Sequence, residues 1–278
     1  MELPNRIRRF FYHPFVVRTI NYLNIRTPMR WLYYLLAKQK DDKKRISFNN
    51  IEALFFIDTP LKLRSVETPF TEGMGDERAA LNKLLNYINS SDVIYDIGAN
   101  IGIHTVFMAK KTGPSGKVVA FEPESNTFIS LKENINLNLL NNVIPMQAAL
   151  GNDFSKKKLY TSGATGDFTL LDTSKNRFRQ DVTIVNGDAL VRQRNLPFPH
   201  IVKIDVEGFE YYVVQGLKST CMQEKCRLVF CEIHPEMLPK AVRAEDIISL
   251  LKSYGFNKVE VYPRGETLHV FCNKSDKD

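Results

Sequence analysis

A glycine-containing turn followed by a distant acidic residue is the first feature of this chain that could do chemistry. The turn has the sequence DIGANIG at residues 96–102, directly after an apolar run. Gly98 allows the backbone to turn sharply, and Gly102 allows the following helix to pack close to the preceding strand. Glu122 ends the next apolar run, KVVAF, at a spacing where an acid accepts both ribose hydroxyls of a bound adenosine. The pattern therefore indicates a site for a nucleoside.

The asparagine in this turn helps to decide which nucleoside is bound. A dinucleotide fingerprint has the form Gly-x-Gly-x-x-Gly, because its second glycine lets a pyrophosphate approach the backbone. Asn100 occupies that second position. An asparagine there is a poor fit to NAD, because its side chain stands where the pyrophosphate would approach the backbone. S-adenosylmethionine has no phosphate and presents a methionine zwitterion to the same turn. We therefore expect S-adenosylmethionine as cofactor, bound by Asp96, Gly98, Asn100, Gly102, His104, Thr105 and Glu122.

Charged side chains alternate with apolar ones where two later runs end. The sequences are KIDVEG at residues 203–208 and CEIHP at residues 231–235. Because successive side chains of a strand point to opposite faces, we expect the polar members on one face, near the reactive end of the sheet. They are Lys203, Asp205, Glu207, Glu232 and His234.

Three of these side chains are candidates for taking a proton from an acceptor hydroxyl. A base within hydrogen-bond reach strengthens a hydroxyl nucleophile in an in-line methyl transfer. We expect Asp205, Glu207 and His234 to be catalytic, with His234 as the base at neutral pH. A divalent ion held by the carboxylates is an alternative to a base, but we expect no metal. In the structural alternative, which we favour for Glu210, these acids only turn the chain and begin a helix, and Lys203 only neutralises Asp205.

The elements that must position these residues follow from the hydrophobic pattern. Short β-branched runs alternate with stretches of helical periodicity, which predicts parallel strand–helix–strand units. We expect strands at 93–97, 117–121, 143–147, 200–206 and 227–233, helices at 103–111, 126–138, 210–217 and 244–254, and a closing hairpin of strands 258–262 and 267–272. The predicted fold is α/β: a Rossmann-like class I methyltransferase with a seven-stranded, mostly parallel sheet and an antiparallel last strand.

Other segments do not follow this alternation. Alternating apolar residues predict a small hairpin within 46–66, and helical spacing predicts a helix at 76–88. Polar residues and glycines interrupt the pattern at about 156–185, where we expect an insertion over the active face. A charged run near residue 45 suggests two parts: a helical arm at residues 1–45 and a methyltransferase domain at residues 46–278.

The positive charge of the chain is concentrated in the arm. Residues 1–45 hold eleven Lys and Arg against three acids, for a net charge of +8, whereas the remainder holds 27 against 28, for −1. A body without excess positive charge argues against a nucleic-acid substrate. Aromatic residues interleaved with the cations suit contact with an anionic membrane surface or a partner protein. Alternatively, the aromatics pack the arm onto the sheet while the cations stay solvated.

Compartment is also suggested by the pattern of apolar residues. The apolar runs, such as residues 31–37, are much shorter than the roughly 20 residues of a membrane-spanning helix. No signal-peptide series opens the chain. We therefore expect a cytoplasmic protein, with peripheral membrane contact through residues 1–45 as an option.

Taken together, the motifs resemble those of the FkbM family of methyltransferases. The shared pieces are DIGANIG at 96–102, FEP at 121–123 followed by Phe128 and Asn134, ALG at 149–151, and KIDVEG at 203–208 with Glu210. The resemblance implies a class I fold, S-adenosylmethionine as methyl donor, and O-methylation of a hydroxyl on a sugar, glycolipid or secondary metabolite. It also implies that Asp96, Gly98, Asn100, Gly102 and Glu122 line the cofactor. An RNA-directed methyltransferase that uses the arm as a clamp, and a catalytically silent adaptor with the same fold, are the alternatives.

Overall fold

The computed structural model describes residues 10–11, 13–22, 25–37, 42–70, 77–161, 168–170 and 177–274. Within the chain, residue contacts define two compact units, residues 1–71 and residues 72–278. Residue 45, where the sequence suggests a boundary, lies inside the first unit.

The first unit combines helices with a hairpin. Its elements are α2 (Pro14–Tyr22), α3 (Arg26–Ala37), β1 (Lys43–Phe48), β2 (Ile51–Phe56), α4 (Pro60–Glu67) and a 3-10 turn at Thr68–Phe70. A hairpin is present, as predicted, but it pairs β1 with β2 and therefore begins before residue 46. Leu61 and Leu63, which the sequence analysis placed in the hairpin region, lie in α4 instead. That helix begins here because Pro60 occupies its first turn and the Thr59 side chain accepts a hydrogen bond from a backbone amide.

A buried acid joins α3 to the hairpin. Glu67 is fully buried and accepts hydrogen bonds from the Tyr33 hydroxyl and, at 2.7 Å, from Lys44 Nζ. Trp31 and Leu35 of the same helix are exposed. One side of α3 therefore packs within the unit while another faces solvent. Among the described residues, no helix has both the length and the apolar character that crossing a membrane requires.

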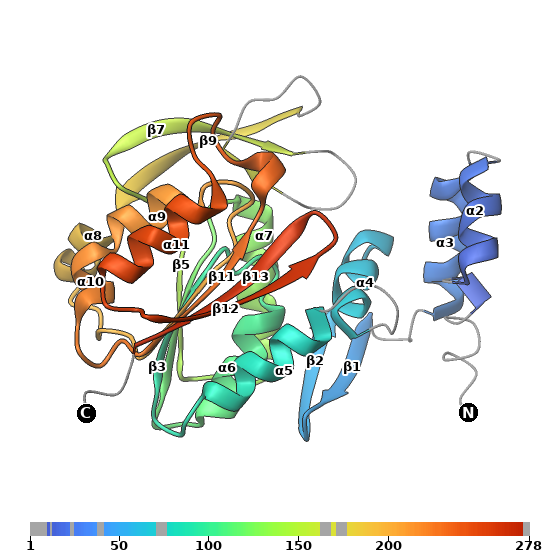
Figure 1. Cartoon of the computed structure of the whole chain (residues 1–278). Helices are drawn as coiled ribbons and strands as arrows, with labels where there is room; N and C mark the ends of the chain where they lie inside the picture. Colours follow the sequence, from blue (N-terminus) through green and yellow to red (C-terminus); the bar gives the residue numbers. More distant parts are fainter. Residues whose placement is uncertain are drawn as a thin grey trace. The chain divides into compact units, whose positions relative to one another are not determined.

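The second unit is built on the predicted seven-stranded sheet, which is confirmed (Figure 1). In spatial order its strands are β12 (Lys258–Arg264), β13 (Thr267–Asn273), β11 (Leu228–Ile233), β10 (Ile201–Ile204), β3 (Val93–Ile97), β4 (Lys117–Phe121) and β5 (Val143–Met146). β13, the last strand, is antiparallel to both of its neighbours, β11 and β12, and the other neighbouring pairs are parallel. The chain order reverses between β3 and β10. Ligands of open α/β sheets bind at such a reversal, outside the carboxyl ends of the strands.

Helices cover both faces of this sheet (Figure 1). They are α5 (Glu77–Tyr87), α6 (Ile103–Thr112), α7 (Ser125–Leu137), α8 (Gly187–Gln193), α9 (Glu210–Gly216), α10 (Lys218–Met222) and α11 (Ala244–Ser253). Val119 and Phe121 of β4 belong to a core shared with α9 and α11, whereas Ala120 packs against Leu131 and Ile135 of α7. The central strands are thus buried on both faces, which explains their continuous apolar runs.

A second, smaller sheet contains the predicted insertion. It has the order β6 (Ala149–Gly151), β9 (Arg177–Asn186), β7 (Ser155–Thr161) and β8 (Phe168–Thr169). Buried side chains alternate along it, including Leu159, Val182 and Ile184. Gly163 and Gly166, which marked the insertion in the sequence, lie outside the described residues. The insertion is therefore an ordered sheet over most of its described length, and not an irregular loop.

Two glycines test how closely the turn after β3 approaches β10. Gly98 and Gly265 have positive φ angles of +78° and +56°, so alanine costs about 1 kcal/mol at either position. A Cβ at Gly98 would lie 1.8 Å from the carbonyl oxygen of Asp205, whereas one at Gly265 has nothing within 4 Å. We expect Gly98→Ala to lower the free energy of unfolding by at least about 2 kcal/mol more than Gly265→Ala in urea titrations. Equal losses would contradict this close approach.

Candidate active site

The turn after β3 is held in shape by the acid that ends β4. The amides of Gly98 and Ala99 both donate to the Phe121 carbonyl at 3.0 Å. Asn100 has a left-handed φ of 52°, and its amide donates to Glu122 Oε2 at 2.9 Å. The other oxygen of Glu122 accepts from the Glu124 amide, also at 2.9 Å. The predicted turn and the predicted acid are therefore directly bonded to each other.

An open cavity of about 630 Å³ lies at these strand ends. Gly98, Asn100 and Glu122 line it on one side, and Asp205 and Glu207 line it on another. Its apolar wall includes Ile97, Phe121, Leu150, Leu159, Leu170 and Phe209. Predicted cofactor residues and predicted catalytic residues thus share one cavity, partly covered by the second sheet.

Four predicted cofactor residues do not line this cavity: Asp96, Gly102, His104 and Thr105. Asp96 is fully buried, accepts a hydrogen bond from the Thr105 hydroxyl at 2.6 Å, and forms an ion pair with Lys203. A Cβ on Gly102 would lie 2.6 Å from the Leu131 side chain, so this glycine permits helix packing. Burial, with the charge of Lys203, lowers the pKa of His104 to about 4, so its ring is neutral near pH 7.

Lys203 joins the ends of β3 and β10. It is 2% exposed, and its Nζ lies 3.2 Å from Asp96 Oδ1 and 3.3 Å from Asp205 Oδ2. The same ammonium donates to the Gly98 carbonyl at 3.0 Å. Burial acts to lower the pKa of Lys203, but the charges of Asp96 and Asp205 outweigh it and raise that pKa above its usual value. Lys203 therefore neutralises two acids, one of which the sequence analysis did not assign to it.

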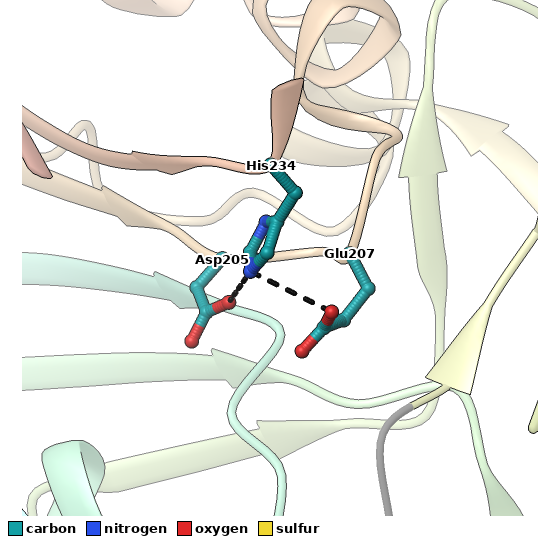
Figure 2. Close-up of side chains that lie close together, drawn as sticks. All are labelled: Asp205, Glu207 and His234. Atoms are coloured by element: carbon teal, nitrogen blue, oxygen red, sulfur yellow. Dashed lines mark ion pairs between the residues drawn. The ribbon is translucent and has the colours of Figure 1, made fainter. Parts of the chain in front are cut away.

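The three predicted catalytic side chains converge (Figure 2). Nε2 of His234 lies 3.5 Å from Glu207 Oε2 and 3.9 Å from Asp205 Oδ1. His234 follows the end of β11 and is almost completely buried, while Asp205 and Glu207 are about a quarter exposed on the cavity side. One buried imidazole thus faces two carboxylates that reach the cavity.

Glu207 reaches this cluster from a turn and not from a strand, which corrects the sequence analysis. β10 ends at Ile204, two residues before the end predicted for this strand. Glu207 and Gly208 have left-handed φ angles of 51° and 97°, which no strand residue adopts. A Cβ on Gly208 would lie 2.2 Å from the Met237 carbonyl oxygen, so glycine is required there. Strand alternation therefore accounts for the position of Lys203, which lies in β10. Asp205 and Glu207 lie beyond the end of the strand, so alternation does not account for them.

Glu210 holds the far side of the His234 ring, a role that the sequence analysis missed. It begins α9 as expected, but it is fully buried. Its Oε1 lies 2.8 Å from His234 Nδ1 and accepts a hydrogen bond from the Gly208 amide at 2.9 Å. The available signal was an acid inside the otherwise apolar stretch GFEYYVV, because acids are rarely buried without a partner.

The carboxylates around His234 make this site attractive to positive charge. Burial acts to lower the pKa of His234, but the bond to Glu210 and the charges of Glu207 and Asp205 raise it to about 10. The ring is therefore cationic at neutral pH in the free protein. A cationic imidazole cannot accept a proton, so the carboxylates are the available proton acceptors.

A further ionic group extends the site toward the edge of the sheet. Glu232 accepts a hydrogen bond from Arg264 at 2.9 Å and lies 3.3 Å from His269 Nε2. Arg264 also binds Glu77 at 2.9 Å. Burial acts to raise the pKa of Glu232, but His269, His234 and Arg264 lower it to about 2. Nothing in the sequence indicated that Arg264 and Glu77 belong to the site. Their segments were used only to predict a helix and a hairpin.

The described residues also form a second cavity beside this ionic group. It measures about 420 Å³ and lies between α5 and the hairpin of β12 and β13. Its lining is Ala79, Ala80, Lys83, Tyr262, His269 and Phe271. His269 is 1% exposed, and its ring contacts that of Phe230.

Comparisons with known proteins identify a family and individual proteins that are similar to this chain. The sequence profile of the family described as Methyltransferase FkbM domain matches residues 96–258. Hexuronic acid methyltransferase AglP of Haloferax volcanii is 30% identical over 166 residues, which cover 60% of this chain and 66% of that protein. Methyltransferase sdnD of Sordaria araneosa is 32% identical over 120 residues, which cover 42% of this chain and 45% of that protein. The matched regions thus span less than two thirds of these relatives.

Among solved structures, the chain is similar to a methyltransferase FkbM from Methylobacillus flagellatus. The identity is 14% and the TM-score is 0.46, over 65% of this chain and 43% of that protein.

Replacing Lys203 tests whether its buried charge holds the site together. Lys203→Met would leave Asp96 and Asp205 without their shared cation, so we expect a loss of about 3–5 kcal/mol in the free energy of unfolding. Asp96→Asn added to Lys203→Met should recover part of the loss, since it removes one uncompensated charge. Denaturant titrations of the single and double variants measure both effects. A loss below about 1 kcal/mol for Lys203→Met would refute the role given to this residue.

Proposed function

The chain belongs to the FkbM methyltransferase family, and we propose that it transfers a methyl group from S-adenosylmethionine to a hydroxyl of a sugar, glycolipid or secondary metabolite. One observation carries this proposal: a single cavity is lined both by the acid that suits ribose and by two carboxylates suited to an acceptor hydroxyl. The two halves of a methyl-transfer site are then adjacent.

The residues of the cavity fit the proposed cofactor. Glu122 is 4% exposed, and each of its oxygens accepts one backbone hydrogen bond. A carboxylate oxygen has two lone pairs, so both oxygens keep capacity for ribose hydroxyls. The turn at Gly98 and Asn100 would hold the methionine part, and apolar side chains of the cavity would hold the adenine. When bound, S-adenosylmethionine supplies an electrophilic methyl group on a sulfonium.

The protein's own contribution to the reaction is to orient the acceptor and take its proton. Asp205 and Glu207 line the cavity and can each accept a hydrogen bond from a hydroxyl. His234, fixed by Glu210, holds positive charge between them. We propose that Asp205, Glu207 and His234 act together in proton transfer. The carboxylates accept the proton of the acceptor hydroxyl, and the imidazole holds the carboxylates in position.

Two observations favour a sugar or small-molecule acceptor over RNA. The relative in Haloferax volcanii carries the name hexuronic acid methyltransferase. The cavity's polar side is acidic, with Asp205 and Glu207 at its surface. An acidic surface repels a phosphate backbone, so the arm alone would have to supply any affinity for RNA.

Binding of S-adenosylhomocysteine tests the cofactor assignment. Burial raises the pKa of Glu122 to about 7, although its two backbone hydrogen bonds act to lower it. Because the ionised carboxylate is the stronger acceptor for ribose hydroxyls, we expect affinity to rise between about pH 6 and pH 8. Glu122→Gln should weaken binding by about 1–3 kcal/mol and remove most of this pH dependence. Calorimetry measures both, with Glu133→Gln on the exposed face of α7 as the matched control.

Absence of binding, or an unchanged affinity in Glu122→Gln, would refute the assignment. Transfer of a labelled methyl group to sugars and hexuronic acids then identifies the accepting atom. A methyl ether survives mild alkali, whereas a methyl ester is hydrolysed. Alkali-stable label supports a hydroxyl acceptor, and alkali-labile label contradicts it.

For the arm we propose contact with an anionic membrane surface. Phe15 of α2 and Leu35 of α3 are 72% and 65% exposed, and Trp31 is 49% exposed. These apolar side chains lie in the segment of residues 1–45 that carries the +8 net charge. Exposed aromatics together with cations are typical of interfacial helices.

Vesicle sedimentation tests this contact. We expect the whole chain to bind vesicles rich in phosphatidylserine and to bind neutral vesicles weakly, because cations and apolar side chains act together. Phe15→Ala should reduce binding several-fold. The matched control is Phe154→Ala, which removes a phenylalanine of 66% exposure from the second unit. Equal binding by both variants, or no preference for anionic lipid, would exclude the proposal.

A further inference from the structure

We propose that Asp205, Glu207 and His234 form a binding site for a divalent metal ion. Its role in catalysis depends on the function proposed above, whereas the site itself is defined by side chains that are in place without cofactor or acceptor. The sequence alone favoured no metal, because it did not place the histidine between the two acids.

The spacing of the three side chains is close to that of a metal-ligand set. One ligand atom from each lies within 4.8 Å of the others. Nε2 of His234 is 3.5 Å from Glu207 Oε2 and 3.9 Å from Asp205 Oδ1. Ligand atoms bound about 2.1 Å from one ion lie about 3.0–3.4 Å apart, depending on the coordination angle. Relative movements of the ligand atoms by a few tenths of an ångström to about 1.5 Å, divided between the three side chains, would therefore close the triangle.

The chemical types of the ligands narrow the choice of ion. Carboxylate oxygens suit magnesium and manganese, and imidazole suits zinc, iron and nickel. A set of two carboxylates and one imidazole therefore fits Mn²⁺ well, and admits Zn²⁺ and Fe²⁺. Three protein ligands also leave coordination positions open, as in catalytic sites and not in closed structural ones.

Glu210 provides an independent indication, because it holds His234 as metal-binding histidines are held. Such histidines give their second ring nitrogen to a carboxylate or carbonyl, which fixes the orientation of the ring. Here Glu210 Oε1 lies 2.8 Å from Nδ1, so Nε2 faces Asp205 and Glu207. The Glu210 carboxylate is fully buried, and its Oε2 has no hydrogen-bond partner among the described residues. Burying such an acid is costly unless the ring beside it holds positive charge.

The balance of charges around the ring points in the same direction. Four carboxylates lie within 3.9 Å of the ring nitrogens of His234, and they belong to Asp205, Glu207, Glu210 and Glu232. Two other cations also pair with members of this group: Lys203 with Asp205, and Arg264 with Glu232. Both are shared with a further acid, Lys203 with Asp96 and Arg264 with Glu77. A proton on the ring supplies one positive charge, whereas a divalent ion supplies two. The site is therefore better balanced with the ion than with the proton.

The position of the site gives the ion a use in the proposed reaction. Asp205 and Glu207 line the cavity, so the open coordination positions face the space for the acceptor. A hydroxyl bound to a divalent ion ionises more readily than a free one. The methyl–sulfur bond would break as the methyl–oxygen bond forms. The hydroxyl proton would pass to solvent, because Asp205 and Glu207, the proton acceptors proposed for the metal-free site, would then hold the ion.

Direct titration with Mn²⁺ tests the site apart from methyl transfer. The full chain, freed of metal with a chelator, is titrated near pH 8 without cofactor or acceptor, and free Mn²⁺ is measured by electron paramagnetic resonance. We expect saturable binding that Glu207→Gln and Asp205→Asn each weaken by at least about tenfold. Glu210→Gln, which leaves all three ligand side chains in place, should weaken it by about 10- to 100-fold. Glu236→Gln, an exposed acid two residues past His234, should bind as wild type.

A spectroscopic measurement on the unaltered protein covers the case in which a variant fails to fold. Pulsed electron paramagnetic resonance of bound Mn²⁺ should show coupling to a directly coordinated imidazole nitrogen. Saturable binding with this coupling supports the site. Absence of saturable binding of Mn²⁺, absence of the nitrogen coupling, or equal affinity in a folded Glu207→Gln would overturn it.

Failure of the site and failure of the proposed function give different results. Mn²⁺ binding at these residues without methyl transfer to any acceptor would support the metal site and contradict the proposed function. Methyl transfer that persists in chelator, with no Mn²⁺ bound, would support the proposed function and contradict the metal site.

Discussion

One buried ammonium group holds the two halves of the candidate site in register. Lys203 Nζ contacts Asp96 on β3, Asp205 after β10 and the carbonyl oxygen of Gly98 in the turn. An uncompensated charge in the protein interior is costly, so none of these groups can move far without the others. Together with the pairing of β3 and β10 and the hydrogen bond from the Asp205 amide to the Ile97 carbonyl, this side chain fixes the turn that suits a nucleoside relative to the loop that carries the carboxylates. Both segments line the same cavity.

Alternating charges continue from this lysine along one face of the sheet. Next to Asp205 lies His234, and beyond Glu232 lies Arg264, which also binds Glu77 on α5. Cations thus lie beside the acids of this row, and the groups interact as one network. Such a network offsets part of the cost of placing several carboxylates next to a largely apolar cavity. The proposed proton acceptors, Asp205 and Glu207, are part of it.

The second sheet and the loop after β10 show how packing shapes the cavity. β7 contributes Leu159 to the apolar wall, and Thr169 of β8 donates a hydrogen bond to the Glu207 carbonyl at 2.7 Å. The left-handed conformation of Glu207 is supported by this bond and by the close approach of Gly208 to Met237. Strained backbone of this kind persists only where surrounding contacts determine it. The insertion therefore helps to place a candidate catalytic side chain.

The sequence by itself determined the strands of the main sheet, the helices α5, α6, α7, α9 and α11, and the two motif-bearing strand ends, whereas α8 and α10 were not predicted. Apolar periodicity is a local property, and it placed β3, β4 and α6 to within one residue at each end. The turn at residues 96–102 and Glu122 were also evident, because both motifs are contiguous with their strands. Periodicity failed where a local cap decided the structure, as at α4, and where a strand ended early, as at Ile204.

Only the tertiary structure decided which charged groups meet. Glu210 lies opposite His234, 24 positions further along the chain, and Arg264 reaches Glu77 across 187 positions. Such pairs depend on strand register and on helix packing, which single-sequence patterns do not specify. The sequence could therefore name Asp205, Glu207 and His234 as candidates. It could not show that a buried acid fixes the histidine ring and turns its free nitrogen toward both carboxylates.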